Sequence, residues 1–152
     1  MRIVRVQTEP VSLADADALS AGRTDVGAVC AFIGRVRAAN DGDAVTALEL
    51  EHYPGMTEAA LEAICAQAET RWPLTGVMAV HRVGRLLPGE PIVLAAAASA
   101  HRDAAFEAAR FVMDALKTDA PFWKKETGPA IDRWLDARAS DEAARARWTL
   151  SE

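Results

Sequence analysis

The longest uninterrupted apolar run, IVLAAAA at residues 92–98, is the feature that most limits how this chain can fold. The run is far shorter than the roughly 20 residues that a membrane-spanning helix needs. A short apolar run between a proline and polar residues is typical of a buried strand. Other elements must cover such a strand, so we expect a core built around residues 91–99.

The periodicity of the remaining apolar residues predicts further strands and helices. Together with 91–99, strands are predicted at residues 2–6, 27–37, 45–53 and 77–83. Apolar residues spaced by three and four predict one helix between Thr57 and Pro73 and another from about Arg102. A short apolar segment at 131–137 and a helix near 140–148 close the chain. The order predicts one α+β domain over residues 1–152, with helices packed on a mainly antiparallel sheet.

Local signals add detail to this outline. The turn sequence ANDGD at 39–43 predicts a hairpin between the strands on either side of it. Gly34, within the first of these strands, is a candidate for a bulge. Thr57 is a candidate cap for the first helix, and Ser99 or Asp103 for the second. The inner face of the second helix is predicted to carry Phe106, Ala109, Met113 and Leu116.

The charge balance excludes one broad class of function. The chain has 17 basic and 22 acidic residues and a net charge of −5, which is unfavourable for general nucleic-acid binding. Any cationic site must therefore be local. Cys30 and Cys65 are far apart and have no ligand-like spacing. We expect buried thiols, no metal site, no cofactor and, without a secretory signal at the start, a cytoplasmic protein.

The decapeptide KTDAPFWKKE at 117–126 gathers three lysines around two aromatic residues. Pro121 disfavours helical geometry at Ala120, so the second helix is predicted to end near residue 118 or 119. Lys117 then lies in its last turn, where the helix dipole favours a solvated cation. Lys124 lies beyond the break. Both lysines can serve one site only if the APFW turn folds Lys124 back.

Two other segments carry cations. SAHR at 99–102 lies where a buried strand passes into a helix, a position that suits anion binding. GRVR at 34–37 places two arginines two residues apart, hence on one face of a strand. His52, His81, Trp123 and Trp134 are interpreted as structural or packing residues. Taken together, the cations suggest a phosphate-sized anion site made of Arg35, Arg37, His101, Arg102, Lys117 and Lys124.

Three ordered blocks of this sequence resemble the large catalytic subunit of molybdopterin synthase. They are GRVRAANDGDAVTALELEHYPGMTEAAL at 34–61, HRVGRLLPGE at 81–90 and SAHRDAAFEAARFVMDALKTDAPFWKKE at 99–126. The first block keeps the family's spacing at Arg37, Asn40, Gly42, Leu48, Glu51, Tyr53 and Met56. The resemblance extends from about Gly27 to Arg138. After Arg37 the family often has Asn-His where this chain has Ala38-Ala39, so a substrate contact by that turn is not carried over.

The resemblance implies a fold of the hammerhead type and a sulfurtransferase activity. Enzymes of this family convert cyclic pyranopterin monophosphate to molybdopterin, which acts in molybdenum cofactor biosynthesis. The two sulfurs come from the C-terminal thiocarboxylate of a small ubiquitin-like subunit with a Gly-Gly tail. The large subunits form a homodimer at the centre of a heterotetramer. The resemblance therefore implies three partners: that small subunit, the pterin and a second copy of the chain.

The resemblance also implies roles for individual residues. The family's essential lysine corresponds to Lys117 and its second lysine to Lys124. Phosphate and pterin contacts correspond to Arg37, His101 and Arg102, with Lys125 and Glu126 beside them, and to Arg138, which the family supplies from the partner protomer. Arg35 keeps a cation at a variable position, and Phe32 and Met113 match apolar pocket positions. Lys117 then acts either as a general acid or as a transient acyl acceptor, and Lys124 stabilises developing negative charge.

Two alternatives remain open from the residues themselves. One is a Schiff-base lysine enzyme that acts on a phosphorylated carbonyl compound, for which borohydride would trap an adduct at Lys117. The other is a non-catalytic module whose groove receives the C-terminal tail of another protein, for which Lys117→Ala would leave function intact.

Overall fold

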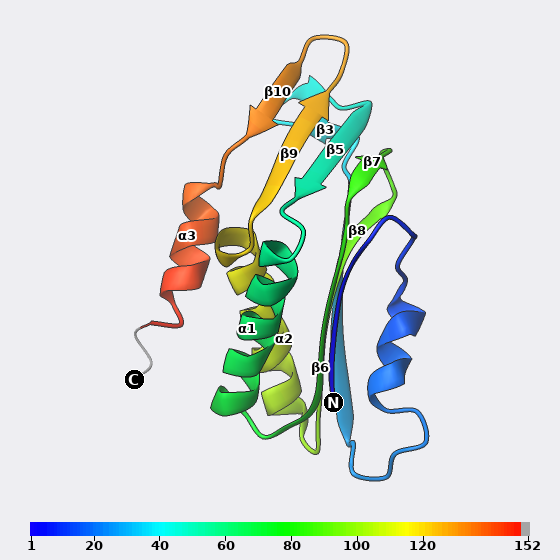
Figure 1. The fold of residues 1–152 in the computed structure, drawn as a ribbon, viewed down its shortest axis with the longest axis vertical. Coiled ribbons are helices and arrows are strands. Elements are labelled where there is room, and N and C mark those ends of the chain that lie inside the picture. Colours follow the sequence, from blue (N-terminus) through cyan, green and yellow to red (C-terminus); the bar gives the residue numbers. More distant parts are fainter. Residues whose placement is uncertain (150–152) are drawn as a thin grey trace.

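A computed structural model describes residues 1–149, which fold into two four-stranded sheets, a two-stranded ladder and several helices (Figure 1). The first sheet has the order β1-β6-β8-β2. Its strands are β1 (Arg2–Gln7), β6 (Leu74–Arg82), β8 (Pro91–Ser99) and β2 (Ala28–Arg35). β1 is parallel to β6, and the other pairs are antiparallel. The predicted strand at 91–99 is therefore confirmed, with neighbours on both sides.

The second sheet is antiparallel throughout and has the order β10-β9-β5-β7. Its strands are β10 (Asp132–Leu135), β9 (Phe122–Thr127), β5 (Ala47–His52) and β7 (Gly84–Leu86). A small ladder, β3 (Ala39–Asn40) with β4 (Asp43–Ala44), follows β2 and precedes β5 in the sequence. The second sheet extends beyond the ends of the two long helices (Figure 1).

Helices cover both faces of the first sheet. α1 (Met56–Arg71) and α2 (Arg102–Asp119) lie side by side on one face, and the short 3₁₀ helix η1 (Leu13–Leu19) lies on the other (Figure 1). β6 alternates between them: Val77 and Ala79 belong to the helix-side core, and Met78 and Val80 to the η1-side core. This period of two is what a strand buried on both faces requires. α3 (Ala139–Ala146) packs beside α2.

The α+β class and the mainly antiparallel pairing are confirmed, but the predicted hairpin is wrong. β2 pairs with β8 and β5 pairs with β7 and β9, so these two strands belong to different sheets. The ANDGD turn closes only the β3–β4 ladder, with Asp41 and Gly42 at φ 51° and 84°. The bulge at Gly34 is confirmed, because the register shifts there and an added Cβ would lie 2.9 Å from Val93 Cγ1.

The ends of the helices differ from the expected caps. The residue that caps α1 is Gly55, whose N–H donates to Glu58 Oε2, and α2 begins after His101. Phe106 is 61% exposed, because the inner face of α2 is set by the alanines at 105, 108 and 109 and by Val112. No described helix is long and apolar enough to cross a membrane, and no His, Cys, Asp and Glu group within 1–149 has a metal-binding arrangement.

Candidate functional site

The connection from α2 to β9 carries Lys124 back toward Lys117. α2 ends at Asp119, Ala120 is extended, and β9 starts directly after Pro121. The Thr57 hydroxyl donates to the Pro121 carbonyl at 2.9 Å and accepts the Tyr53 N–H at 3.0 Å. The first turn of α1 therefore holds the α2–β9 connection in place. β9 then runs along β5, with Lys124 opposite Leu50.

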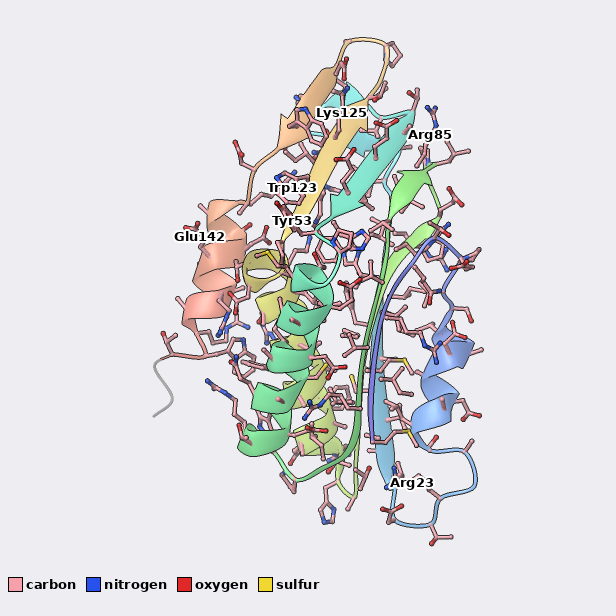
Figure 2. All side chains as sticks on the ribbon, viewed as in Figure 1. Arg23, Tyr53, Arg85, Trp123, Lys125 and Glu142 are labelled. Atoms are coloured by element: carbon pink, nitrogen blue, oxygen red, sulfur yellow. The ribbon has the colours of Figure 1, made fainter. Side chains whose placement is uncertain are left out.

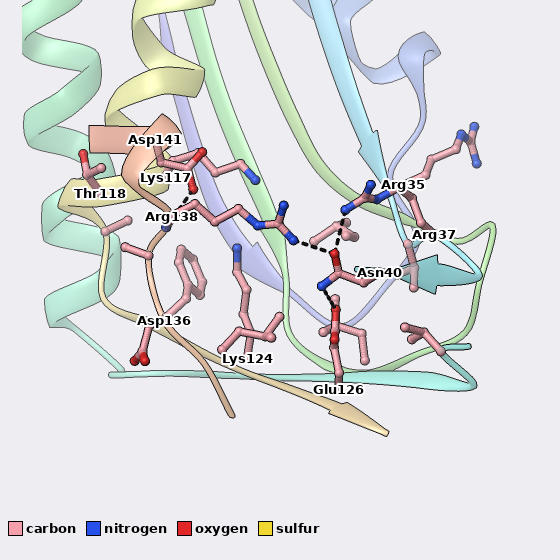
Figure 3. A pocket seen from close by; sticks show the side chains of 18 residues that line it. Arg35, Arg37, Asn40, Lys117, Thr118, Lys124, Glu126, Asp136, Arg138 and Asp141 are labelled. Carbon is pink, nitrogen blue, oxygen red and sulfur yellow. Dashed lines mark hydrogen bonds between the residues drawn. The ribbon is translucent and has the colours of Figure 1, made fainter. Parts of the chain in front are cut away.

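The two lysines face one cavity of about 330 Å³. In Figure 3, the side chains of Lys117, Lys124 and Arg138 converge from α2, β9 and the segment before α3. Arg37 approaches from the segment after β2. With Arg35, five cationic residues thus line one hollow of an acidic chain, which suits a ligand with several negative charges.

Asn40 fixes the positions of the two arginines. Its Nδ2 donates to Glu126 Oε1 at 2.6 Å, and its Oδ1 accepts from Arg37 Nη2 at 3.2 Å and from Arg138 Nη2. Glu126 is only 5% exposed and its second oxygen accepts from Arg133 at 3.2 Å. Both ends of the Asn40 amide are therefore used, and the arginines are held before any ligand arrives.

A second cavity of about 440 Å³ shares a wall with the first. The shared residues are Arg35, Arg37, Ile92, Lys117 and Lys124. The rest of its lining is largely apolar and consists of Phe32, Ile33, Gly34, His81, Val93, Met113 and Leu116. The lysine pair therefore lies between a polar hollow and an apolar one.

The surroundings of Lys124 lower the pKa of its ammonium group. Burial and, to a smaller extent, the charge of Lys117 lower the pKa of Lys124 to about 8, although Asp141 acts in the opposite direction. About a tenth of Lys124 is then neutral at pH 7, whereas an ordinary lysine is almost fully charged. A lysine of this kind can accept a proton or an acyl group near neutral pH.

Three of the expected binding residues lie elsewhere in this chain. His101 and Arg102 lie at the start of the 18-residue α2, about 22 Å along the helix axis from Lys117. Lys125 lies on the outer face of the second sheet (Figure 2), where it forms an ion pair with Asp132 at 3.1 Å. None of these three lines either cavity. Arg35, Arg37, Glu126, Arg138, Phe32 and Met113 do line one or both.

With this geometry established, the chain can be compared with known proteins. Residues 6–119 match the family described as MoaE protein. The chain belongs to the MoaE family. A molybdopterin synthase catalytic subunit from Ralstonia nicotianae is 54% identical over 151 residues, which is 99% of this chain and 86% of that protein.

Solved structures of the MoaE family share the fold. The molybdopterin cofactor biosynthesis protein E from Burkholderia multivorans is 54% identical, with a TM-score of 0.83 over 100% of this chain and 99% of its own. The molybdopterin synthase structure from Staphylococcus aureus is 31% identical, with a TM-score of 0.80 over 86% of this chain and 95% of its own. The fold that the sequence resemblance implied is thus confirmed.

Some residues of this MoaE site were not identified from the sequence. Asn40 appeared only as a spacing match, although it connects both arginines to Glu126. His81 was interpreted as structural, yet it lines the second cavity. Asp141, which lines the first cavity, had no signal beyond its place at the start of a helix. Trp123 and Trp134 are exposed beside Tyr53, on the outer face of the second sheet.

Proposed function

We propose that this chain is the catalytic subunit of a molybdopterin synthase and converts cyclic pyranopterin monophosphate to molybdopterin. One observation carries the proposal: Lys117 and Lys124 face a single cavity together with Arg37 and Arg138. Family membership supports the same conclusion, because relatives more than half identical over nearly the whole chain carry that name.

The two cavities suggest how the reactants are received. Arg37 and Arg138 bind the phosphate of the pterin in the polar cavity, since guanidinium groups pair well with phosphate oxygens. The C-terminal tail of a thiocarboxylated small subunit reaches the lysines through the more apolar cavity, past Phe32 and Met113. Both reactants then meet at the lysine pair.

The lysines divide the chemistry by their protonation. Lys117 orients the thiocarboxylate and assists its attack on the pterin. Lys124 is mostly protonated at pH 7 and stabilises developing negative charge. Its neutral fraction makes Lys124, as well as Lys117, a candidate transient acyl acceptor.

The assembly that we propose is a homodimer of this chain with a small subunit at each end. His101 and Arg102, which are exposed and remote from their own chain's lysines, would serve the cavity of the other copy. Arg138 reaches the cavity of its own chain. We further propose one domain over residues 1–152 and a cytoplasmic location, which an oxidation-sensitive thiocarboxylate donor and two unpaired thiols support.

The decisive experiment mixes the purified protein, a thiocarboxylated small subunit and cyclic pyranopterin monophosphate, and measures the dithiolene product. We expect product from the native protein and none from Lys117→Ala, which should still bind the small subunit. Equal product from both proteins would exclude the proposed role of Lys117, and no product from the native protein would exclude the function.

The lowered pKa of Lys124 also favours a second candidate, a Schiff-base enzyme, because amine catalysis needs a neutral lysine. Borohydride reduction in the presence of a phosphorylated carbonyl compound tests it. A stable adduct at Lys117 or Lys124, without any need for a small subunit, would support this reading. Its absence alongside dithiolene formation would exclude it.

A further inference from the structure

His81 is a buried titratable residue that the proposed mechanism does not use. It lies near the end of β6, is 5% exposed, and lines the second cavity together with Lys117 and Lys124. A histidine beside two ammonium groups is an unusual choice for a position that only needs filling, because protonation would add a third positive charge. The hydrogen bonds of its ring show which form it takes.

The ring carries its hydrogen on Nδ1. Nδ1 lies 2.8 Å from the Arg82 carbonyl oxygen, which can only accept a hydrogen bond, so Nδ1 must donate. Burial, and then the charges of Lys124 and Lys117, lower the pKa of His81 to about 3, so the ring is neutral. Nε2, on the other edge of the ring, therefore presents a lone pair, and no residue among 1–149 donates to it.

The ring is also held in a fixed plane. It stacks on Phe122 with 3.8 Å between centroids and 21° between planes. Phe122 and Lys124 are two residues apart on β9 and so lie on the same face of that strand. His81 therefore contacts Phe122, whose side chain is the neighbour of the Lys124 side chain on that face of β9.

We propose that His81 is a positioning residue for the lysine pair: its neutral ring supports Phe122, and its Nε2 accepts a hydrogen bond from the Lys124 ammonium group when that side chain turns toward the second cavity, both before and during the reaction. The role deepens the proposed function and rests on it. An imidazole acceptor stabilises the ammonium form without adding charge, whereas an apolar side chain of equal size would only exclude water.

Other charged groups also act on Lys124, and the test must separate His81 from them. Those that line its cavities are Lys117, Asp141, Glu126, Asp136, Arg35, Arg37 and Arg138. His81→Phe keeps an aromatic ring that can stack on Phe122, although phenyl is somewhat larger than imidazole, and it leaves all of these groups in place. It removes the two ring nitrogens.

The experiment titrates lysine in protein labelled with ¹³C-lysine, which gives a simple spectrum because the chain has only Lys117, Lys124 and Lys125. In His81→Phe we expect the Lys124 pKa to fall below its native value by roughly half a unit or more, since the ammonium group loses an acceptor. We also expect a loss of about tenfold or more in kcat, with a smaller change in KM. His52→Phe is the matched control, because His52 pairs with Glu58 and lines neither lysine cavity.

A measurement on the native protein keeps the proposal testable if His81→Phe does not fold. The ¹⁵N shifts of its three histidine rings should show one ring, that of His81, with hydrogen on Nδ1 alone and no titration between roughly pH 5 and 8. Hydrogen on Nε2, or an unchanged Lys124 pKa and kcat in folded His81→Phe, would overturn the inference. Neither pKa nor ¹⁵N readout needs pterin or small subunit, so failure of the proposed function would leave both results interpretable.

Discussion

A single amide, that of Asn40, determines where two arginines of the polar cavity lie. An amide can donate at one end and accept at the other, and Asn40 does so toward Glu126 on one side and Arg37 and Arg138 on the other. No charged side chain of the same size can make this set of contacts. The geometry of the phosphate site therefore depends on a residue that need not touch the ligand.

Asn40→Asp tests this dependence, because it places a second carboxylate against the buried Glu126. We expect an increase in KM for the pterin and a loss of about 1–3 kcal/mol in the free energy of unfolding. Repulsion between the new carboxylate and Glu126 raises the pKa of this pair in the folded state. The destabilisation should therefore grow as rising pH ionises both carboxylates, and it should shrink in acid. Urea denaturation at several pH values measures it, and a pH-independent stability equal to the native value would contradict the prediction.

The buried position of Lys124 lowers the stability of the folded protein. Its pKa falls from 10.5 unfolded to about 8 folded, so the folded state disfavours the charged form. The penalty is fully present below pH 8 and disappears as pH rises toward 10.5. Lys124→Met should therefore raise the free energy of unfolding at pH 7 by about 1–3 kcal/mol while abolishing sulfur transfer. Denaturation of the two proteins at pH 7 and above pH 10 checks this, since the difference should decrease with pH.

Among the elements, α1 has an effect beyond its own packing, because its first turn holds the α2–β9 connection. Thr57 is fully buried, and its hydroxyl joins the Tyr53 N–H to the Pro121 carbonyl. A helix thus fixes the turn that brings a distant strand, and with it Lys124, back to the site.

Thr57→Val keeps the shape of the side chain and removes this bridge. We expect a loss of about 1–3 kcal/mol, because two backbone groups lose their partner in the interior, together with a lower kcat. Thr46→Val is the matched control, since the Thr46 hydroxyl also donates to a carbonyl, that of Thr127, but at an exposed position. Thermal denaturation and product assays compare the two, and equal effects would contradict the role of Thr57.

The elements also show how far the sequence could predict this structure. The strand at 91–99 and the end of α2 before Pro121 follow from local composition and were predicted correctly. The predicted hairpin between β2 and β5 is wrong, because a tight turn specifies only the residues next to it. β2 pairs instead with β8, and β5 with β9, both far along the chain. The same limit hid the Asn40–Glu126 bond, which joins residues 86 positions apart. Cations could be named from the sequence, but which of them meet depends on such distant pairings.

For the whole molecule, the position of the site follows from the meeting of two sheets. The first sheet and its helices supply Lys117 and His81, and the second supplies Lys124 and Glu126. Although the chain has a net charge of −5, cations outnumber carboxylates in the lining of this cavity. Anions should therefore find the cavity even when no pterin is present.

Inorganic phosphate provides a test at this scale. We expect it to raise the melting temperature by a few degrees or less at millimolar concentration, as a ligand specific for the folded state does, whereas sodium chloride at equal ionic strength should not. Arg37→Ala and Arg138→Ala should each reduce the shift. Arg110→Ala, an exposed arginine on α2 that lines neither cavity, should leave it unchanged. A shift that survives both cavity substitutions would contradict this location.

The grouping of all three lysines between residues 117 and 125 has a practical consequence, because every other side-chain cation in the chain is an arginine or a histidine. Reagents that acylate primary amines, such as fluorescent esters, biotin esters and activated chips, find only one lysine, Lys125, outside the two cavities. Apart from the N-terminal amine, they can attach only at the site itself or on the strand that carries it. Amine coupling that reaches Lys117 or Lys124 should therefore inactivate this protein, whereas coupling at Lys125 or at the N-terminal amine should not block the cavity.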